Sequence, residues 1–136
     1  MVSSIKNMRI LGVDYGTKRI GIAMTDEGAQ MAFPKLVLQN DAKLVENFKK
    51  IITENEIKTV VLGESKDFKM VDNEIMKEIL DFRDVLEKEL NVDVVMYSEI
   101  YSSAQAEFFQ GKTELLDASA AAIILQSYLE SRKNKK

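Results

Sequence analysis

The sequence contains no cysteine and no histidine. Without cysteine, the chain can form neither a disulfide bond nor a thiolate zinc site. Without histidine, it can use neither a Ser-His-Asp nor a Cys-His mechanism, and it can build no histidine-based metal site. Any catalysis must therefore rely on carboxylates, hydroxyls, amines and the metal ions that such groups bind.

Long apolar segments and a strong net charge are also missing. No apolar run reaches the length of a membrane span, and residues 1–9 lack the core of a signal peptide, so we expect a cytoplasmic protein. The 19 basic and 22 acidic residues give a net charge of −3. This charge is not typical of proteins that coat nucleic acid non-specifically, so a nucleic-acid enzyme would need its basic residues on one face.

The remaining composition is that of an ordinary globular domain. The chain has 136 residues, of which 46% are hydrophobic and 30% charged, which is enough to bury a core. It shows no internal repeat, linker or low-complexity tract. We therefore expect a single domain over residues 1–136, with residues 1–7 and 132–136 frayed.

The hydrophobic pattern changes period along the chain. Short apolar runs bounded by turn residues predict strands at 8–14, 19–25, 35–38, 59–63 and 92–97. Apolar residues at steps of three and four predict helices through 44–52, 71–90, 102–110 and 117–131. The helix at 71–90 has mixed charges on its polar face, so we expect no membrane partner. The order βββαβαβαα predicts an α/β fold, a five-stranded mixed sheet with helices on both faces.

Two residues have predicted local roles at the ends of these elements. Gly16 lies in the turn after the first strand, where a glycine is free to take a positive φ. Asp41 precedes the first helix and is well placed as its N-cap.

Three acidic residues stand near predicted element ends. Asp14 ends the first strand, Glu99 follows the fifth strand, and Asp117 begins the last helix. In open α/β sheets, ligands gather at the carboxyl ends of the strands. Grouped carboxylates repel one another unless a cation lies between them, and Mg²⁺ or Mn²⁺ suits such all-oxygen sites. Two such ions can activate a water and stabilise the leaving oxygen of a phosphodiester.

Each of these acids also has an ordinary interpretation. Asp14 could belong to a turn, Glu99 could be a solvated strand-end residue, and Asp117 could be a helix N-cap worth about 1 kcal/mol. Spacing alone does not assemble the three residues into a site. The residues by themselves therefore indicate a candidate carboxylate–metal site and no more.

Three segments resemble a known protein family. GVDYGTKRIGIA, at residues 12–23, closely resembles the opening motif of the YqgF/RuvX family. DASAAAIILQSYL, at residues 117–129, is similar to the last helix of that family. YSEIYSSAQA, at residues 97–106, resembles a degraded form of its Asp-Glu-Arg-Leu-Thr-Thr segment. The resemblance covers residues 9–130, and the three segments occur in the family's order.

The resemblance implies an RNase H-like fold and a nuclease that uses Mg²⁺ or Mn²⁺. It implies that Asp14, Glu99 and Asp117 are the catalytic acids and metal ligands. The basic residues that would hold the nucleic acid are Lys18, Arg19, Lys66 and Lys69. Members of the family are described as pre-16S ribosomal RNA nucleases and as Holliday-junction resolvases. We expect processing of the 5′ end of pre-16S ribosomal RNA, with branched DNA as the alternative substrate.

Two departures from the family pattern motivate a further alternative, against which the intact Asp14, Glu99 and Asp117 argue. Ile100 stands where the family has an arginine, and Gly63-Glu64-Ser65 stands where it usually has Gly-Leu-Pro. These changes could weaken or retune the enzyme, or leave a non-catalytic protein that still binds nucleic acid. Glu64 could join the metal site or be a surface residue.

A rival interpretation is ATP binding. Residues 14–17, together with Asp26 after the next strand, resemble the phosphate loop of actin-like and sugar-kinase ATPases. Those proteins bind ATP between two domains, whereas this chain has room for one, so we rank ATP binding below the nuclease. The sequence leaves open the oligomeric state and whether cleavage is endo- or exonucleolytic.

Overall fold

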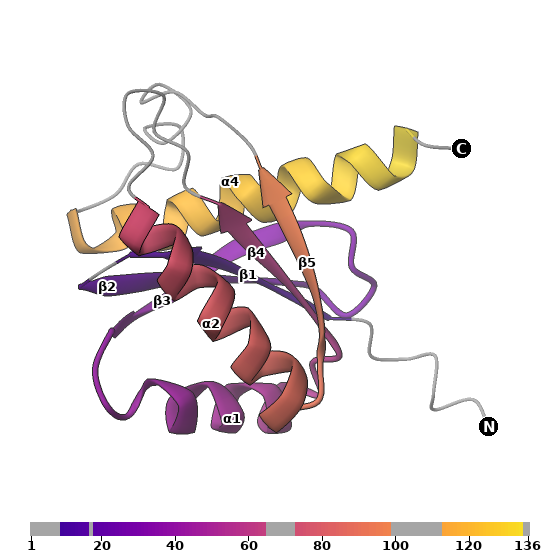
Figure 1. Ribbon diagram of the computed structural model, residues 1–136. Coiled ribbons are helices and arrows are strands. Elements are labelled where there is room, and N and C mark those ends of the chain that lie inside the picture. Colours follow the sequence, from indigo (N-terminus) through magenta and orange to yellow (C-terminus); the bar gives the residue numbers. More distant parts are fainter. Residues whose placement is uncertain (1–8, 17, 65–72, 99–112, 135–136) are drawn as a thin grey trace.

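The computed structural model describes residues 9–16, 18–64, 73–98 and 113–134 (Figure 1). Side chains are described within 9–16, 18–63, 76–97 and 120–132. The strands are β1 (Ile10–Tyr15), β2 (Arg19–Thr25), β3 (Ala32–Gln39), β4 (Thr59–Glu64) and β5 (Asp93–Ser98). The helices are α1 (Leu44–Asn55), α2 (Asn73–Glu89) and α4 (Thr113–Asn134). The helix predicted at 102–110 lies outside the described residues.

The strands form one mixed sheet in the order β3-β2-β1-β4-β5. β2 pairs antiparallel with both β1 and β3, while β1, β4 and β5 run parallel to one another. The predicted five-stranded mixed sheet is therefore confirmed. β3 is longer than predicted and includes Pro34, which an edge strand tolerates because one side of its backbone needs no ladder partner.

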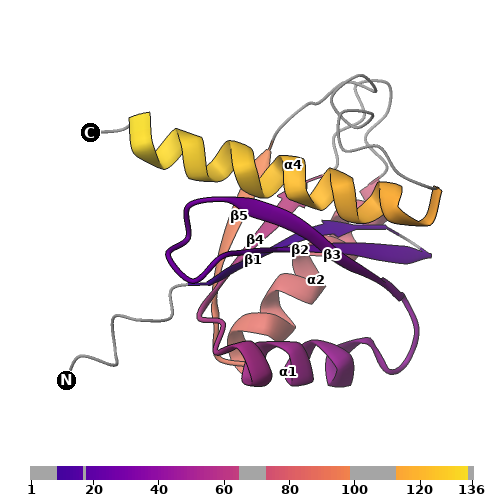
Figure 2. The ribbon, with the colours of Figure 1, turned by 180° about the vertical axis from the view of Figure 1, so that it is seen from behind.

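Helices cover both faces of the sheet, as predicted. α1 and α2 lie on one face and α4 crosses the other (Figures 1 and 2). The first face buries a core around Phe48, Ile79 and Leu86 against the sheet. The second face buries small and branched residues of α4, among them Ala121 and Leu125, against β1 and β2. Among the described residues, no helix has both the length and the apolar character needed to cross a membrane.

The predicted N-cap of α1 is wrong. α1 begins at Leu44 after Lys43, and no side chain caps its first turn. Asp41 instead closes a turn before the helix: its carboxylate accepts a hydrogen bond from the Lys43 N–H at 3.0 Å. Its carbonyl accepts another from the Leu44 N–H at 3.1 Å. An aspartate can bond its neighbours in either arrangement, so sequence position alone does not distinguish a turn from a cap.

The conformation predicted for Gly16 is also wrong, since no described glycine has a positive φ. The position is crowded instead: a Cβ atom on Gly16 would lie 2.5 Å from the carbonyl oxygen of Arg19. Glycine is required there because the turn folds closely back on itself.

Candidate functional site

Asp14 lies at the centre of the sheet, one residue before the end of β1. It is half-buried and pairs with Gly21 of β2 and Gly63 of β4. Val13 and Tyr15 belong to the core beneath α1 and α2, so strand alternation puts Asp14 on the face that α4 covers. Both strand neighbours on that face lack a side chain, and Ile124 of α4 packs directly on Gly63.

The parallel strands β1, β4 and β5 all end at the same edge of the sheet. Gly63 pairs with Tyr97, and Glu64 pairs with Ser98 at the ends of β4 and β5. Glu99 follows Ser98 directly but lies outside the described residues, and for Glu64 only the backbone is described. The register therefore agrees with a site at this edge without placing the Glu99 carboxylate.

The predicted start of the last helix is wrong, because Asp117 does not begin it. α4 begins at Thr113, so Asp117 is the fifth residue of the helix and cannot be its N-cap. The backbone of α4 runs close over β1, since a Cβ atom on Gly12 would lie 3.1 Å from the carbonyl oxygen of Ala121. Residue 117 lies one helical turn before Ala121, and Asp14 lies two residues beyond Gly12.

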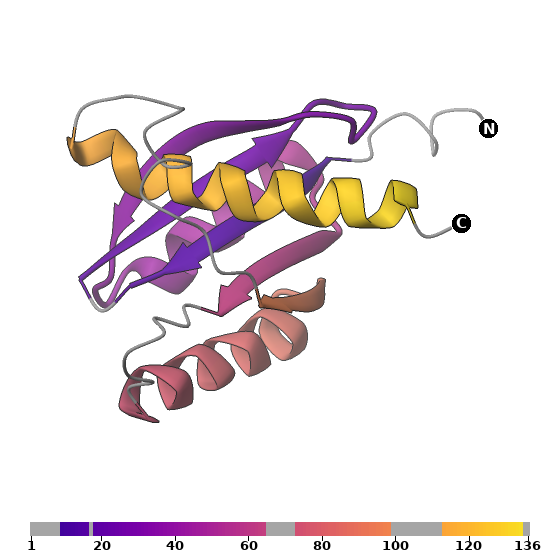
Figure 3. The ribbon, with the colours of Figure 1, turned by 90° about the horizontal axis from the view of Figure 1, so that it is seen from above.

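The direction of α4 decides whether residue 117 lies toward Asp14 or away from it. Its last turns lie by the turn after β2, where Leu129 and Ala29 line the same pocket. Its first turns therefore point toward the end of β1, as the view from above shows (Figure 3). The backbone thus carries residue 117 toward the end of β1 that holds Asp14, while the Asp117 side chain lies outside the described residues.

The complete acidic triad remains a prediction. Asp14 is its only member with a described side chain, and within the described part of the chain no three acidic side chains gather to hold a metal. Of the predicted phosphate-binding residues, Lys18 and Arg19 are exposed at the turn that follows Asp14. Lys66 and Lys69 lie outside the described residues, as does Ile100.

Two polar residues beside this turn were missed by sequence reasoning. The buried Tyr15 donates a hydrogen bond from its hydroxyl to Glu78 Oε1 at 3.3 Å. Burial raises the pKa of Tyr15; a hydrogen bond with Asn40 opposes this rise, and the charge of Glu78 adds to it. Asn40 also donates from Nδ2 to the carbonyl oxygen of Gly16 at 2.8 Å. No local pattern marks Asn40, because its partners are 24 and 25 residues earlier in the chain.

Asp26 does not belong to the same site. β2 runs antiparallel to β1, so Asp26, which follows β2, lies near the start of β1, whereas Asp14 lies near the end of β1. Its carboxylate accepts hydrogen bonds from the N–H groups of Gln30 at 2.7 Å and Met31 at 3.3 Å. These bonds lower the pKa of Asp26. Asp26 therefore organises the turn between β2 and β3, and its pairing with Asp14 in an ATP phosphate loop is wrong.

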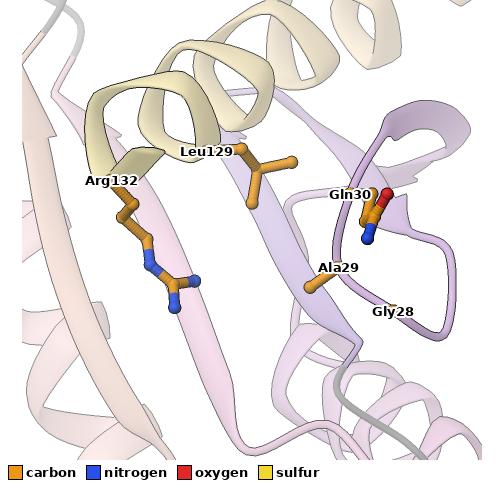
Figure 4. A pocket seen from close by; sticks show the side chains of 5 residues that line it. All are labelled: Gly28, Ala29, Gln30, Leu129 and Arg132. Carbon is orange, nitrogen blue, oxygen red and sulfur yellow. The ribbon is translucent and has the colours of Figure 1, made fainter. Parts of the chain in front are cut away.

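A pocket of about 330 Å³ lies at the far end of α4. Figure 4 shows it between the turn after β2 and the last turns of the helix. The residues that line it are Gly28, Ala29, Gln30, Leu129 and Arg132. None of these is a predicted site residue, so the pocket is separate from the carboxyl edge of the sheet.

A family model described as "RuvX: Holliday junction resolvase" matches residues 8–131. The chain belongs to the RuvX family. The predicted family is thus confirmed, and the nuclease class of the enzyme follows from it. A relative from Malacoplasma penetrans is 32% identical over 138 residues, which cover 93% of this chain and 97% of the relative. A relative from Caldanaerobacter subterraneus is 32% identical over 141 residues, covering 93% and 99%. The names of both propose that they are pre-16S rRNA nucleases.

Solved structures confirm the predicted fold of this RuvX family member. RuvC of Thermus thermophilus in complex with a Holliday junction substrate superposes with a TM-score of 0.62 at 18% identity, covering 93% of this chain and 97% of RuvC. The fowlpox virus resolvase with Holliday junction DNA superposes with a TM-score of 0.56 at 18% identity, covering 92% and 99%. At this level of identity the likeness establishes the RNase H-like fold alone.

Proposed function

We propose that this RuvX family member is a metal-dependent nuclease that hydrolyses phosphodiester bonds in structured nucleic acid. Its proposed role is to process the 5′ end of pre-16S ribosomal RNA in the cytoplasm. The observation that carries the proposal is the position of Asp14. A half-buried carboxylate stands near the end of the central strand between two glycines, on the face that α4 covers. The names of the relatives support ribosomal RNA as the substrate.

The donors at this edge fit a hard divalent cation. Carboxylate oxygens are the ligands that Mg²⁺ and Mn²⁺ prefer, and Asp14 offers such oxygens near the end of the central strand. Asp14, Glu99 and Asp117 would hold one or two ions. When bound, the metal supplies an activated water and stabilises charge on the phosphate.

The other residues have binding roles in this proposal. Lys18 and Arg19 are exposed next to Asp14 and hold the phosphate backbone of the substrate against the carboxylates. Lys66 and Lys69 would extend this contact along the nucleic acid. Because the phosphate contacts are independent of base identity, the substrate is selected by its folded shape.

Branched DNA is the second candidate substrate, since the matching family model is described as a Holliday junction resolvase. One experiment tests both substrates. A labelled structured RNA with a 5′ extension and a labelled four-way DNA junction are each incubated with Mg²⁺, Mn²⁺ or EDTA. Cutting that requires the metal establishes the nuclease, and the preferred probe identifies the substrate class.

The matched variants are Asp14→Asn and Asp93→Asn. Asp93 is an exposed aspartate at the opposite end of the parallel strand β5, so its replacement controls for the change in charge. Asp14→Asn should reduce cleavage by more than about 100-fold, because even residues that merely orient metal ligands contribute about 10- to 100-fold. Both variants should keep the thermal stability of the wild type.

Two results would contradict the proposal. Cleavage retained by Asp14→Asn would rule out the site. Binding without cleavage by the wild type would instead indicate a non-catalytic binding protein. Ile100→Arg and Glu64→Leu would then be the first reversions to test.

A further inference from the structure

The turn between β1 and β2 is held from the end of β3. Asn40 follows β3 directly, and its Nδ2 donates to the carbonyl oxygen of Gly16 at 2.8 Å. Its backbone N–H donates to the carbonyl oxygen of Lys18 at 2.9 Å. One residue thus contacts the turn both before and after position 17.

These contacts lie beyond the regular sheet. The ladder between β2 and β3 ends at the pair Arg19 and Gln39. Asn40 therefore continues the connection past the last strand pair and onto the turn itself. The turn is tight there, because a Cβ atom on Gly16 would lie 2.5 Å from the carbonyl oxygen of Arg19.

Asn40 also connects the turn to the helical layer. Its side chain hydrogen-bonds with the Tyr15 hydroxyl, which donates to Glu78 of α2 at 3.3 Å. The ring of Tyr15 packs on Phe82 of the same helix, with 5.4 Å between ring centroids. The turn is thereby attached to α2 as well as to β3.

This attachment matters because of what the turn carries. Lys18 and Arg19 are exposed, and both have long, flexible side chains. A cation on a fixed backbone holds a phosphate more tightly than one on a mobile backbone, since less freedom is lost on binding. We infer that Asn40 is a positioning residue that orients Lys18 and Arg19 toward the phosphate backbone of the nucleic acid. This inference rests on the proposed function.

A purely structural role for Asn40 predicts a different result, and Asn55 is a matched control. Asn55 is half-buried like Asn40, and its Nδ2 donates to the carbonyl oxygen of Ile51 at 2.9 Å within α1. The variants Asn40→Ala and Asn55→Ala each remove one side-chain bond to a backbone carbonyl without changing the net charge, and Asn40→Ala also removes the contact with the Tyr15 hydroxyl. Affinity for a labelled RNA hairpin is measured with Ca²⁺ at several salt concentrations, beside the thermal stability of each variant.

Asn40→Ala should weaken binding by roughly fivefold to tenfold, as expected for one positioning hydrogen bond. The salt dependence should become shallower by about one phosphate contact. Asn55→Ala should bind like the wild type. In a background that carries Lys18→Ala and Arg19→Ala, Asn40→Ala should cause no further loss, because the cations that it positions are gone.

The inference is overturned by any of three results. The first is that Asn40→Ala and Asn55→Ala bind the RNA with equal affinity. The second is that Asn40→Ala weakens binding just as much in the background that carries Lys18→Ala and Arg19→Ala. The third is that Lys18→Ala and Arg19→Ala by themselves cause no loss of affinity. If Asn40→Ala does not fold, Asn40→Ser beside Asn55→Ser gives the same comparison, since serine is shorter than asparagine and leaves the net charge unchanged. Absence of metal-dependent cleavage by the wild type would refute the proposed nuclease instead. The cleavage assay measures this separately from the affinity.

Discussion

Gly63 lies directly beneath Ile124, so closely that a Cβ atom at position 63 would come within 2.5 Å of Ile124 Cδ1. Gly63, the strand neighbour of Asp14, therefore lacks a side chain for a packing reason. α4 can lie over the centre of the sheet, and so bring residue 117 toward Asp14, because β4 presents a glycine there.

Gly63→Ala should destabilise the fold by about 1–3 kcal/mol, because the added methyl overpacks the layer beneath α4. Ile124→Val removes the nearest atom and by itself should cost about 0.5–1.5 kcal/mol. The double variant should be more stable than the sum of the two single effects predicts, as denaturant unfolding can measure. Strict additivity of the two free energies would show that the contact between positions 63 and 124 is not responsible.

Thr25 has the one buried polar side chain among the described residues, at 3% exposure. Its hydroxyl oxygen accepts a hydrogen bond from the Ile10 N–H at 2.8 Å, which joins the end of β2 to the start of β1. Thr25→Val keeps the shape but leaves that N–H without its partner, so stability should fall by about 1–3 kcal/mol.

Thr53→Val is the matched control for this change. Thr53 is exposed on α1, so its replacement should alter the free energy of unfolding by less than about 0.5 kcal/mol. Equal losses in the two variants, measured by denaturant unfolding, would contradict a role for the hydroxyl of Thr25.

Asp26 should make stability depend on pH in acid. Hydrogen bonds from the Gln30 and Met31 N–H groups lower the pKa of Asp26 in the folded state. The unfolded chain therefore binds a proton at a higher pH than the folded chain does. The stabilisation is present above the ordinary pKa of aspartate and is lost as the pH falls through the lowered value.

Asp26→Asn should accordingly flatten the fall in stability below about pH 4. Urea unfolding between pH 2 and pH 7 would measure this, with Asp93→Asn as a control that removes a carboxylate elsewhere. If both variants and the wild type lose stability in parallel, the hydrogen bonds to Asp26 do not contribute to the acid response.

Much of the fold could be predicted because it depends on patterns within single segments. Leu44, Phe48 and Ile52 are buried on α1, as their spacing predicts. β2 spans the predicted residues 19–25, because an apolar run and its flanking turns act locally. The order of these segments was enough to predict a mixed sheet with helices on both faces.

The errors arose where a local pattern has more than one solution. Asp41 closes a turn rather than capping α1, and α4 begins at Thr113, before the alanine-rich part that is similar to the family's last helix. Gly16 is required by the nearby carbonyl of Arg19, not by a positive φ. At Gly16 a neighbouring carbonyl, rather than the residue's own preference, decides which residue is tolerated.

The sequence alone determined the family, through the motif around Asp14 and the helix that contains Asp117, and it excluded histidine and cysteine chemistry. Only the tertiary structure shows that Asp14 lies between Gly21 and Gly63. It also shows that Asp26 lies at the other end of the strands from Asp14, and that Asn40 contacts the turn that contains Lys18. The physical reason is that strand pairing and helix packing join residues far apart in the chain. Composition and spacing record each residue's preferences but not its partners.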